Sequence, residues 1–410
     1  MRWRELPKEA RVYIVYSSLG CVVLFTWILL PYYMLLTGYS VLEVGLLYTV
    51  VEALGIPLTL AAGKLFSRLD IRRGLAAIDG LGALSLLLYA VSYGPMAPLI
   101  LTVGMLIEKV SRSLYPLYQA YERAVYPQDR LKEVMAWHLR LPELAMVVSY
   151  PVAGFVLGYI CPTDSCARAA FLFFACYSAT IMLLALLLLE PVVLSEEQGG
   201  PGFLEALRSM SGKLRVYVAA YVLYILGWSL APSFALVNYV IETYGGNIFH
   251  AAVVSASISA ATVTATYILD LIPERQGFQA MQVGILIVML GLLAVTTSPP
   301  FALLILTFYV IRIGDAIWFA FNRAWYLSLV SKEEVAIVLA SISALVSLVS
   351  IVSPAIAGLL SHIDPRLPYA ASLLAIASAV PLYWLAGRAR KTQVHDRSSH
   401  CGDESGPSEE

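Results

Sequence analysis

The sequence predicts an all-α membrane protein with twelve transmembrane helices in two pseudo-symmetric six-helix halves. Of its 410 residues, 59% are apolar and only 13% are charged, whereas a soluble domain has about 25% charged residues. About twelve apolar runs approach the ~20 residues that a helix needs to cross a hydrocarbon core ~30 Å thick. Short sequence matches also recur in the same order at offsets of 200 to 204 residues. We therefore expect a chain that crosses the lipid bilayer many times and contains an internal repeat.

The apolar runs give the predicted spans. In order, these are residues 11–36, 41–66, 74–93, 97–122, 135–160, 168–189, 215–238, 249–271, 277–297, 299–327, 335–360 and 368–387. The N-terminal MRWRELPKEAR lacks a small-residue cleavage site, and the run that follows it has full span length. We therefore expect no cleaved signal peptide.

The connections between the predicted spans alternate in charge. Those on one side are short and carry only Arg168 and Arg366, whereas the N-terminal segment and the other loops carry most of the basic residues. Because Lys and Arg are enriched in cytoplasmic loops, both termini are expected in the cytoplasm. The sequence therefore predicts a multi-pass protein of the cytoplasmic membrane. The basic residues form no continuous stripe, which argues against a nucleic-acid partner.

The predicted spans divide the chain into two halves joined by a polar connection. The N-terminal half is expected over residues 1–189, a cytoplasmic central loop over 190–214, and the C-terminal half over 215–388. The tail, residues 389–410, is rich in Ser, Gly and acidic residues, a composition typical of disorder.

Short repeated segments support this division independently of hydropathy. The matched segments are Arg11-Val12-Tyr13 with Arg215-Val216-Tyr217, Leu69-Asp70 with Leu269-Asp270, Glu122-Arg123-Ala124 with Asn322-Arg323-Ala324, and Ala153-Gly154 with Ala357-Gly358. Two parallel halves related by an axis along the membrane normal are the arrangement of one large transporter class.

The fourth and tenth predicted spans carry charges near the middle of the bilayer. Glu108 and Arg112 are four residues apart, and Arg312 and Asp315 are three apart, so each pair shares a helix face. Glu52 in the second span reaches a similar depth. A charge at this depth costs at least ~2.5–3.5 kcal/mol, so its default role is functional. The competing interpretation is that these are static ion pairs that lock the bundle.

These charges predict a pathway for a small-molecule substrate and for protons. A carboxylate that alternately gains and loses a neighbouring arginine can bind and release a proton near neutral pH. The residues predicted to line the pathway are Glu52, Glu108, Lys109, Arg112, Tyr115, Tyr118, Arg312, Asp315 and Asn322. For Lys109 we leave open whether it faces the cavity or makes a packing pair. Asp79 and Glu143 are expected instead to pair with Arg72, Arg73 or Arg140.

The loop after the second predicted span reads GKLFSRLDIRRG. It resembles the signature of the major facilitator superfamily, whose pattern here is G-x-L-a-D-R-x-G-R-R. The matching residues are Gly63, Leu65, Arg68, Arg72 and Arg73. Ser67 replaces the usual acid, and Asp70 replaces the second glycine. The resemblance implies a cytoplasmic charge network that latches the outward-facing state, with Asp70 supplying the carboxylate.

The resemblance covers residues 11–388 and implies a twelve-helix transporter. Arg112 falls where the superfamily has an R-x-x-x-G pattern, which implies a role near proton coupling or substrate binding. Pro116 replaces the glycine, so we expect this helix to kink there.

Two cysteines lie close together in the loop CPTDSC. If this loop is external, a disulfide between Cys161 and Cys166 is permitted, but spacing alone leaves the bridge and two free thiols equally open. The loop offers too few ligands for a metal, so we expect no metal site and no cofactor.

Motifs of enzymes are missing from the sequence. It contains no G-x-S-x-G, H-E-x-x-H or G-x-x-x-x-G-K-[ST] pattern, and its histidines, such as His138, are expected in loops or the tail. We therefore predict no enzyme but a secondary active transporter, acting by alternating access and coupled to protons, for drug or metabolite efflux or solute uptake. It is expected to act as a monomer.

Two alternatives remain open at this point. One is a carrier of organic anions or phosphate esters in which Arg112 and Arg312 clamp the substrate, because paired arginines make strong charge-assisted bonds. The other, of a different class, is a transport-dead receptor or an intramembrane enzyme.

Overall fold

A computed structural model describes residues 3–66, 70–192, 212–273, 276–327 and 332–400. All of its regular secondary structure within these ranges is helical. The N-terminal half contains η1 (Trp3–Glu5), α1 (Lys8–Gly20), η2 (Cys21–Phe25), α2 (Thr26–Leu36), α3 (Val41–Phe66), α4 (Ile71–Ala90), η3 (Gly94–Met96), α5 (Ala97–Ser113), α6 (Pro116–Val125), η4 (Gln128–Arg130), α7 (Leu131–Phe155), η5 (Val156–Ile160) and α8 (Asp164–Leu188). The C-terminal half contains α10 (Gly212–Leu230), α11 (Ser233–Tyr244), α12 (Ile248–Leu271), α13 (Gly277–Thr296), α14 (Phe301–Leu327), α15 (Lys332–Ile363) and α16 (Leu367–His400).

The helices are consistent with the twelve predicted spans. Ten helical segments of the described chain are long and apolar enough to cross a membrane, and α10 with α11, bent by 43°, makes an eleventh. The remaining predicted span corresponds to α5 and α6, of which α5 carries three charged residues in 17.

Proline explains the two broken spans. α5 ends at Ser113 and α6 begins at Pro116, which confirms the predicted kink, because proline cannot donate the backbone hydrogen bond that continues a helix. Pro232 precedes α11 in the same way, with an extended backbone conformation of φ −70° and ψ 170°.

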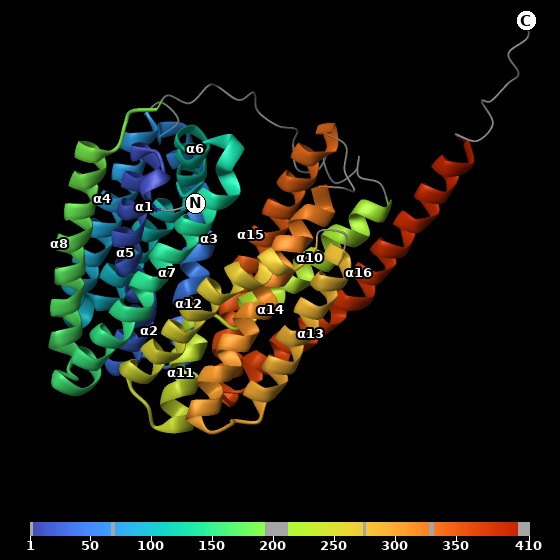
Figure 1. Cartoon of the computed structure of the whole chain (residues 1–410). Coiled ribbons are helices and arrows are strands. Elements are labelled where there is room, and N and C mark those ends of the chain that lie inside the picture. Colours follow the sequence, from blue (N-terminus) through green and yellow to red (C-terminus); the bar gives the residue numbers. More distant parts are fainter. Residues whose placement is uncertain (1–2, 67–69, 193–211, 274–275, 328–331, 401–410) are drawn as a thin grey trace, which may run out of the picture.

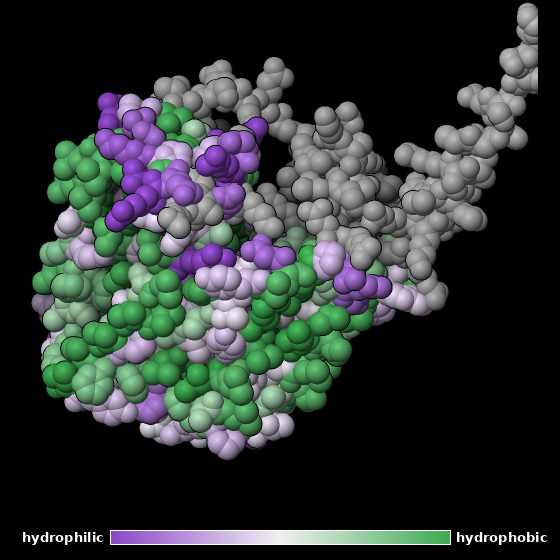
Figure 2. Space-filling model, viewed as in Figure 1, coloured by the Kyte–Doolittle hydropathy of each residue, from purple (hydrophilic) through white to green (hydrophobic). Residues whose placement is uncertain are grey.

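The two ends of the bundle, both visible in Figure 1, differ in how many hydrophilic residues they carry (Figure 2). We call the end that carries the N-terminus and α6 the basic face, and the other end, where α2 ends and α8 begins, the opposite face. Apolar side chains form a broad band between the two faces, while hydrophilic residues gather near the basic face (Figure 2). Many large apolar side chains in this band are exposed, such as Val148, Leu187 and Leu374, as expected for a surface in contact with lipid.

The two halves share one hydrophobic core only toward the opposite face. There Phe25 and Tyr150 belong to the same cluster of buried residues as Phe234 and Ala252 of the C-terminal half. Toward the basic face, the N-terminal half has a separate cluster that contains no residue of the other half. The halves are thus joined mainly at one end (Figure 1).

Two glycines predicted to be repeat-related make this join tight. A Cβ on Gly154 of α7 would lie 2.6 Å from the Cβ of Ala252 in α12. A Cβ on Gly358 of α15 would lie 3.0 Å from the Cα of Gly45 in α3. Glycine at both positions therefore allows helices of different halves to approach closely.

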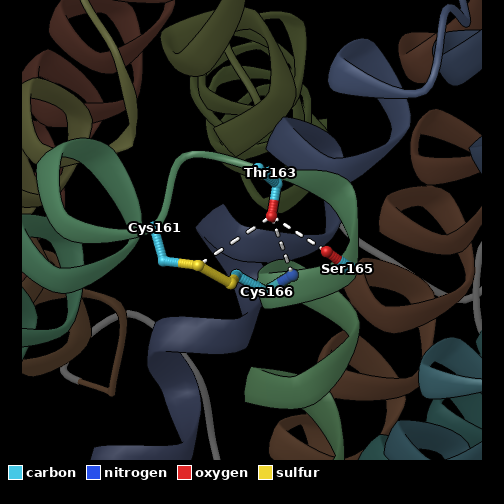
Figure 3. Close-up of a disulfide and its surroundings, with 4 residues drawn as sticks. All are labelled: Cys161, Thr163, Ser165 and Cys166. Atoms are coloured by element: carbon cyan, nitrogen blue, oxygen red, sulfur yellow. Dashed lines mark hydrogen bonds between the residues drawn. A yellow bond between two sulfur atoms is a disulfide. The ribbon is translucent and has the colours of Figure 1, made fainter.

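A disulfide lies at the opposite face, in the loop between η5 and α8. Cys161 and Cys166 are bridged, with Cα atoms 6.0 Å apart. Thr163 caps α8, since its Oγ1 accepts from the backbone N–H of Cys166 at 3.3 Å (Figure 3). Of the two readings that spacing left open, the structure has the bridge.

The last helix extends beyond the predicted span. The backbone of α16 is helical as far as His400, beyond the predicted end of the last span at residue 387 and into the predicted disordered tail. Residues 401–410 and most of the central loop lie outside the described residues.

Candidate functional site

In the N-terminal half, a carboxylate is held between an arginine and a tyrosine. Glu108 of α5 accepts from the hydroxyl of Tyr89 of α4 at 2.7 Å and from Nη2 of Arg112 at 2.5 Å. The guanidinium of Arg112 also lies over the ring of Trp27, 5.0 Å from its centroid. The side chain of Arg112 is 39% exposed and that of Glu108 only 15%.

The C-terminal half repeats this chemistry with other helices. Asp315 of α14 accepts from Nη1 of Arg312 at 2.6 Å and from the hydroxyl of Tyr224 of α10 at 3.1 Å. Nε of Arg312 donates to Oγ1 of Thr262 in α12 at 3.0 Å. Each predicted ion pair is therefore formed, and each carboxylate also has a tyrosine partner on a second helix, which the sequence does not reveal.

Lys109 is paired rather than free. Its ammonium group makes an ion pair with Glu52, which joins α5 to α3. Gly55 leaves room for the lysine stem, because a Cβ there would lie 2.7 Å from Cγ of Lys109. Glu52 thus has a partner from another helix, which the sequence could not reveal.

Asn322 is buried close to α10. Its Oδ1 accepts from the hydroxyl of Tyr217 at 3.3 Å, and its exposed fraction is 3%. This position makes Asn322 part of the packing of the C-terminal half. Its predicted place in the pathway stays a prediction.

A cavity of about 300 Å³ lies within the N-terminal half. Tyr115 and Tyr118 are in its wall, together with the carboxylates of Asp79, Glu108 and Glu122. The two tyrosines were predicted to line a cavity because they flank the face that carries Arg112. The structure places them in this one.

Asp79 and Glu143 have other partners than expected. Asp79 accepts from the hydroxyl of Tyr16 at 2.6 Å, and Glu143 interacts with Ser259 and Thr262 of α12. The predicted pairing of these acids with Arg72, Arg73 or Arg140 is wrong, because each acid lies deeper in the bundle.

The three arginines have other partners instead. Arg72 donates to the carbonyl of Leu186, and Arg73 pairs with Asp70. Arg140 donates to Thr266 at 2.9 Å across the two halves.

His138 also differs from expectation, because it lies inside α7 rather than in a loop. Its Nδ1 is 2.8 Å from the hydroxyl of Tyr126, and its Nε2 is 3.4 Å from a carboxylate oxygen of Glu122. Residue 138 also falls within the predicted span 135–160, so the expectation of a loop position for this histidine is wrong.

Comparison with known families decides the identity of the fold. Residues 12–354 match the model of the Major Facilitator Superfamily. The chain belongs to this superfamily. No relative is found among curated protein sequences.

Solved structures of the superfamily share the fold of this member. A point mutant of the nucleoside transporter NupG has a TM-score of 0.69 at 16% identity, with 93% of this chain and 99% of that chain covered. A bacterial homologue of the iron transporter ferroportin, in an inward-facing state, gives 0.70 at 13% identity, with 92% and 98% covered. A POT family transporter in complex with 5-aminolevulinic acid gives 0.68 at 14% identity, with 94% and 98% covered. These similarities establish the superfamily fold and leave the substrate open.

The superfamily loop between α3 and α4 is described in part. Asp70 caps α4, because its Oδ1 accepts from the backbone N–H of Arg73 at 2.9 Å, and it pairs with Nε of Arg73 at 3.1 Å. Gly63 and Leu65 lie in α3, although their side chains are not among those described, and Arg68 lies outside the described residues. The predicted role of this loop in latching the outward-facing state stays a prediction.

Proposed function

We propose that this superfamily member is a secondary active transporter that moves a small organic solute across the cell membrane, coupled to protons. The observation that carries the proposal is the matching pair of charged sites on α5 and α14. In each half an aspartate or glutamate is shared between an arginine and a tyrosine hydroxyl from a second helix. Charged groups inside a membrane protein mark substrate and ion pathways.

The charge distribution supports an orientation with the basic face in the cytoplasm. The two arginines of the opposite face are each neutralised by a neighbour, since Arg168 pairs with Asp164 at 3.4 Å and Arg366 with Asp364 at 2.8 Å. The hydrogen bonds from Arg366 lower the pKa of Asp364 below its ordinary value. Loops rich in Lys and Arg are characteristic of the cytoplasmic side, and a disulfide suits the other side.

The packing of the halves supports alternating access. Since the halves share a core only toward the opposite face, we infer that this conformer is open toward the basic face. Rocking of one half against the other around a central site would then expose the site to the opposite face. One chain supplies both halves, so we propose that it works as a monomer.

We assign the proton site to Glu108. Its carboxylate lines the cavity and is bound by both Tyr89 and Arg112. A change of the Arg112 side chain to a rotamer that points away from Glu108 would break one of these two bonds, which favours uptake of a proton by the carboxylate. Glu52 and Asp315 remain second choices, because neither borders this cavity.

The test is uptake of a panel of organic solutes into proteoliposomes that contain a pH-sensitive dye. Solute movement accompanied by a dye response supports a proton-coupled carrier. Solute movement without a dye response contradicts the coupling and leaves a uniporter. Binding without movement, or turnover of a solute, would favour the receptor or the enzyme instead.

A further inference from the structure

The cavity in the N-terminal half has walls of a distinctive chemistry. Its aromatic lining consists of Tyr13, Tyr16, Trp27, Tyr115, Tyr118 and His138. Three carboxylates, from Asp79, Glu108 and Glu122, also line it, and none of the described residues in its wall is Lys or Arg. At about 300 Å³ it is at the small end of the range for ligand pockets.

The carboxylates of this wall have different partners. Glu108 is paired with Arg112, and Glu122 lies 3.4 Å from Nε2 of His138. Asp79 has a hydrogen bond from Tyr16 at 2.6 Å, and no Lys or Arg forms an ion pair with it in the described part of the chain. A carboxylate removed from water is costly unless it gains a proton or a positive partner, and a bound cation would supply that partner.

Three basic residues of the predicted pathway are each paired with a carboxylate. Lys109 pairs with Glu52, Arg112 with Glu108 and Arg312 with Asp315. An anionic substrate would have to compete with these carboxylates for each basic group. A cationic substrate meets Asp79 without displacing any ion pair.

We propose that this cavity binds an organic cation that carries a protonated amine, with Asp79 as its counter-charge. The amine replaces the missing positive partner of Asp79, while the tyrosine rings and Trp27 contact the cation through their π faces. This assignment rests on the proposed transport function and names its substrate class. It also disfavours the reading in which Arg112 and Arg312 clamp an anion.

The test is direct binding to the purified full chain in lipid nanodiscs. Tritiated phenethylamine is the cationic probe, and unlabelled 2-phenylethanol and phenylacetate, which have the same ring, are the neutral and anionic competitors. We expect saturable binding of the amine that neither competitor displaces at equal concentration. Asp79→Asn keeps the shape and the hydrogen bond to Tyr16 but removes the charge, and should weaken binding by about tenfold or more.

The matched control is Asp129→Asn. Asp129 lies in η4 at the basic face with a 78% exposed side chain, so its variant should bind the amine as the wild type does. Tyr115→Leu is a second variant that removes a ring from the wall and should weaken binding of the amine several-fold. Gel filtration and melting temperature verify that each variant is folded.

Two results would overturn the inference. One is an amine that binds no better than the neutral alcohol, and the other is Asp79→Asn with unchanged affinity. Because the readout is binding, it is separable from transport. Amine binding without transport would remove the proposed function and leave the site, whereas transport of other solutes without amine binding would remove the site alone.

Discussion

The hydroxyl of Tyr13 in α1 donates a hydrogen bond to Oε1 of Glu122 in α6 at 3.2 Å. The positions that the sequence repeat aligns with these two residues make the same contact, since the hydroxyl of Tyr217 donates to Oδ1 of Asn322 at 3.3 Å. The acceptor is a carboxylate in one half and a neutral amide in the other. The two halves therefore keep a common geometry while their charge differs.

We expect Tyr13→Phe to lower stability more than Tyr217→Phe. Hydrogen bonds to charged groups contribute about 1.5–3 kcal/mol, and neutral ones about 0.5–1.5 kcal/mol. Loss of Tyr13 also leaves Glu122 with fewer donors. Thermal unfolding of the two variants in the same detergent measures the order, and equal melting temperatures would contradict it.

Arg112→Ala should reduce solute uptake to background while the protein stays folded. The substitution removes the partner of Glu108 and the cation over Trp27, both inside the proposed pathway. The control is Arg130→Ala, whose 54% exposed side chain lies in η4 and should leave uptake unchanged. Full activity of Arg112→Ala in proteoliposomes would reduce Arg112 to a structural role.

Glu108→Gln should uncouple solute movement from protons. The amide keeps the size of the side chain and the contact with Tyr89 but no longer exchanges a proton. Uptake should then become independent of an imposed pH gradient, and the dye inside the vesicles should not respond. Glu52→Gln is the comparison, since its partner is Lys109; loss of coupling there instead would move the proton site to Glu52.

Gly154→Ala should shift the protein away from the conformer described here. A Cβ would meet Ala252 at 2.6 Å and the Cα of Phe249 at 3.0 Å, and overpacking of this kind typically costs about 1–3 kcal/mol. Spin labels at positions 129 and 271, in a chain without free cysteines, should move closer as the basic face closes.

Gly82→Ala is the control for this shift. A Cβ at Gly82 has only an ordinary contact of 3.4 Å with Oγ of Ser178, within the N-terminal half. The spin-label distance should therefore stay as in the wild type. If Gly154→Ala leaves that distance unchanged as well, the tight join of the halves does not set the balance between the two conformers.

The disulfide gives a test of orientation. If the opposite face is external, a reductant that cannot cross the membrane should reduce the Cys161–Cys166 bridge in intact cells. Reduction of the bridge, which closes a short loop, should lower the free energy of unfolding by about 2 kcal/mol and leave uptake unchanged. A bridge that is reduced only after the cells are opened would place this face inside the cell.

Much of the fold follows from the sequence because the bilayer restricts the solutions. A chain with this composition must satisfy its backbone hydrogen bonds within helices, so apolar runs such as residues 41–66 appear as helices with nearly the predicted bounds. Pro116 predicted the break after Ser113, because a proline lacks the backbone N–H that continues its own helix. Ion pairs within one helix, such as Glu108 with Arg112, were predictable from the helical period alone.

Contacts between helices were decided only by the tertiary structure. The tyrosine partners of Glu108 and Asp315, the pairing of Glu52 with Lys109 and the hydrogen bond from Tyr16 to Asp79 all join different helices. A tyrosine in an apolar span indicates that its hydroxyl has a hydrogen-bond partner inside the bundle, but the sequence does not identify that partner. Neither the rotation of each helix nor its neighbours can be read from the sequence, because both depend on side-chain packing across the whole bundle.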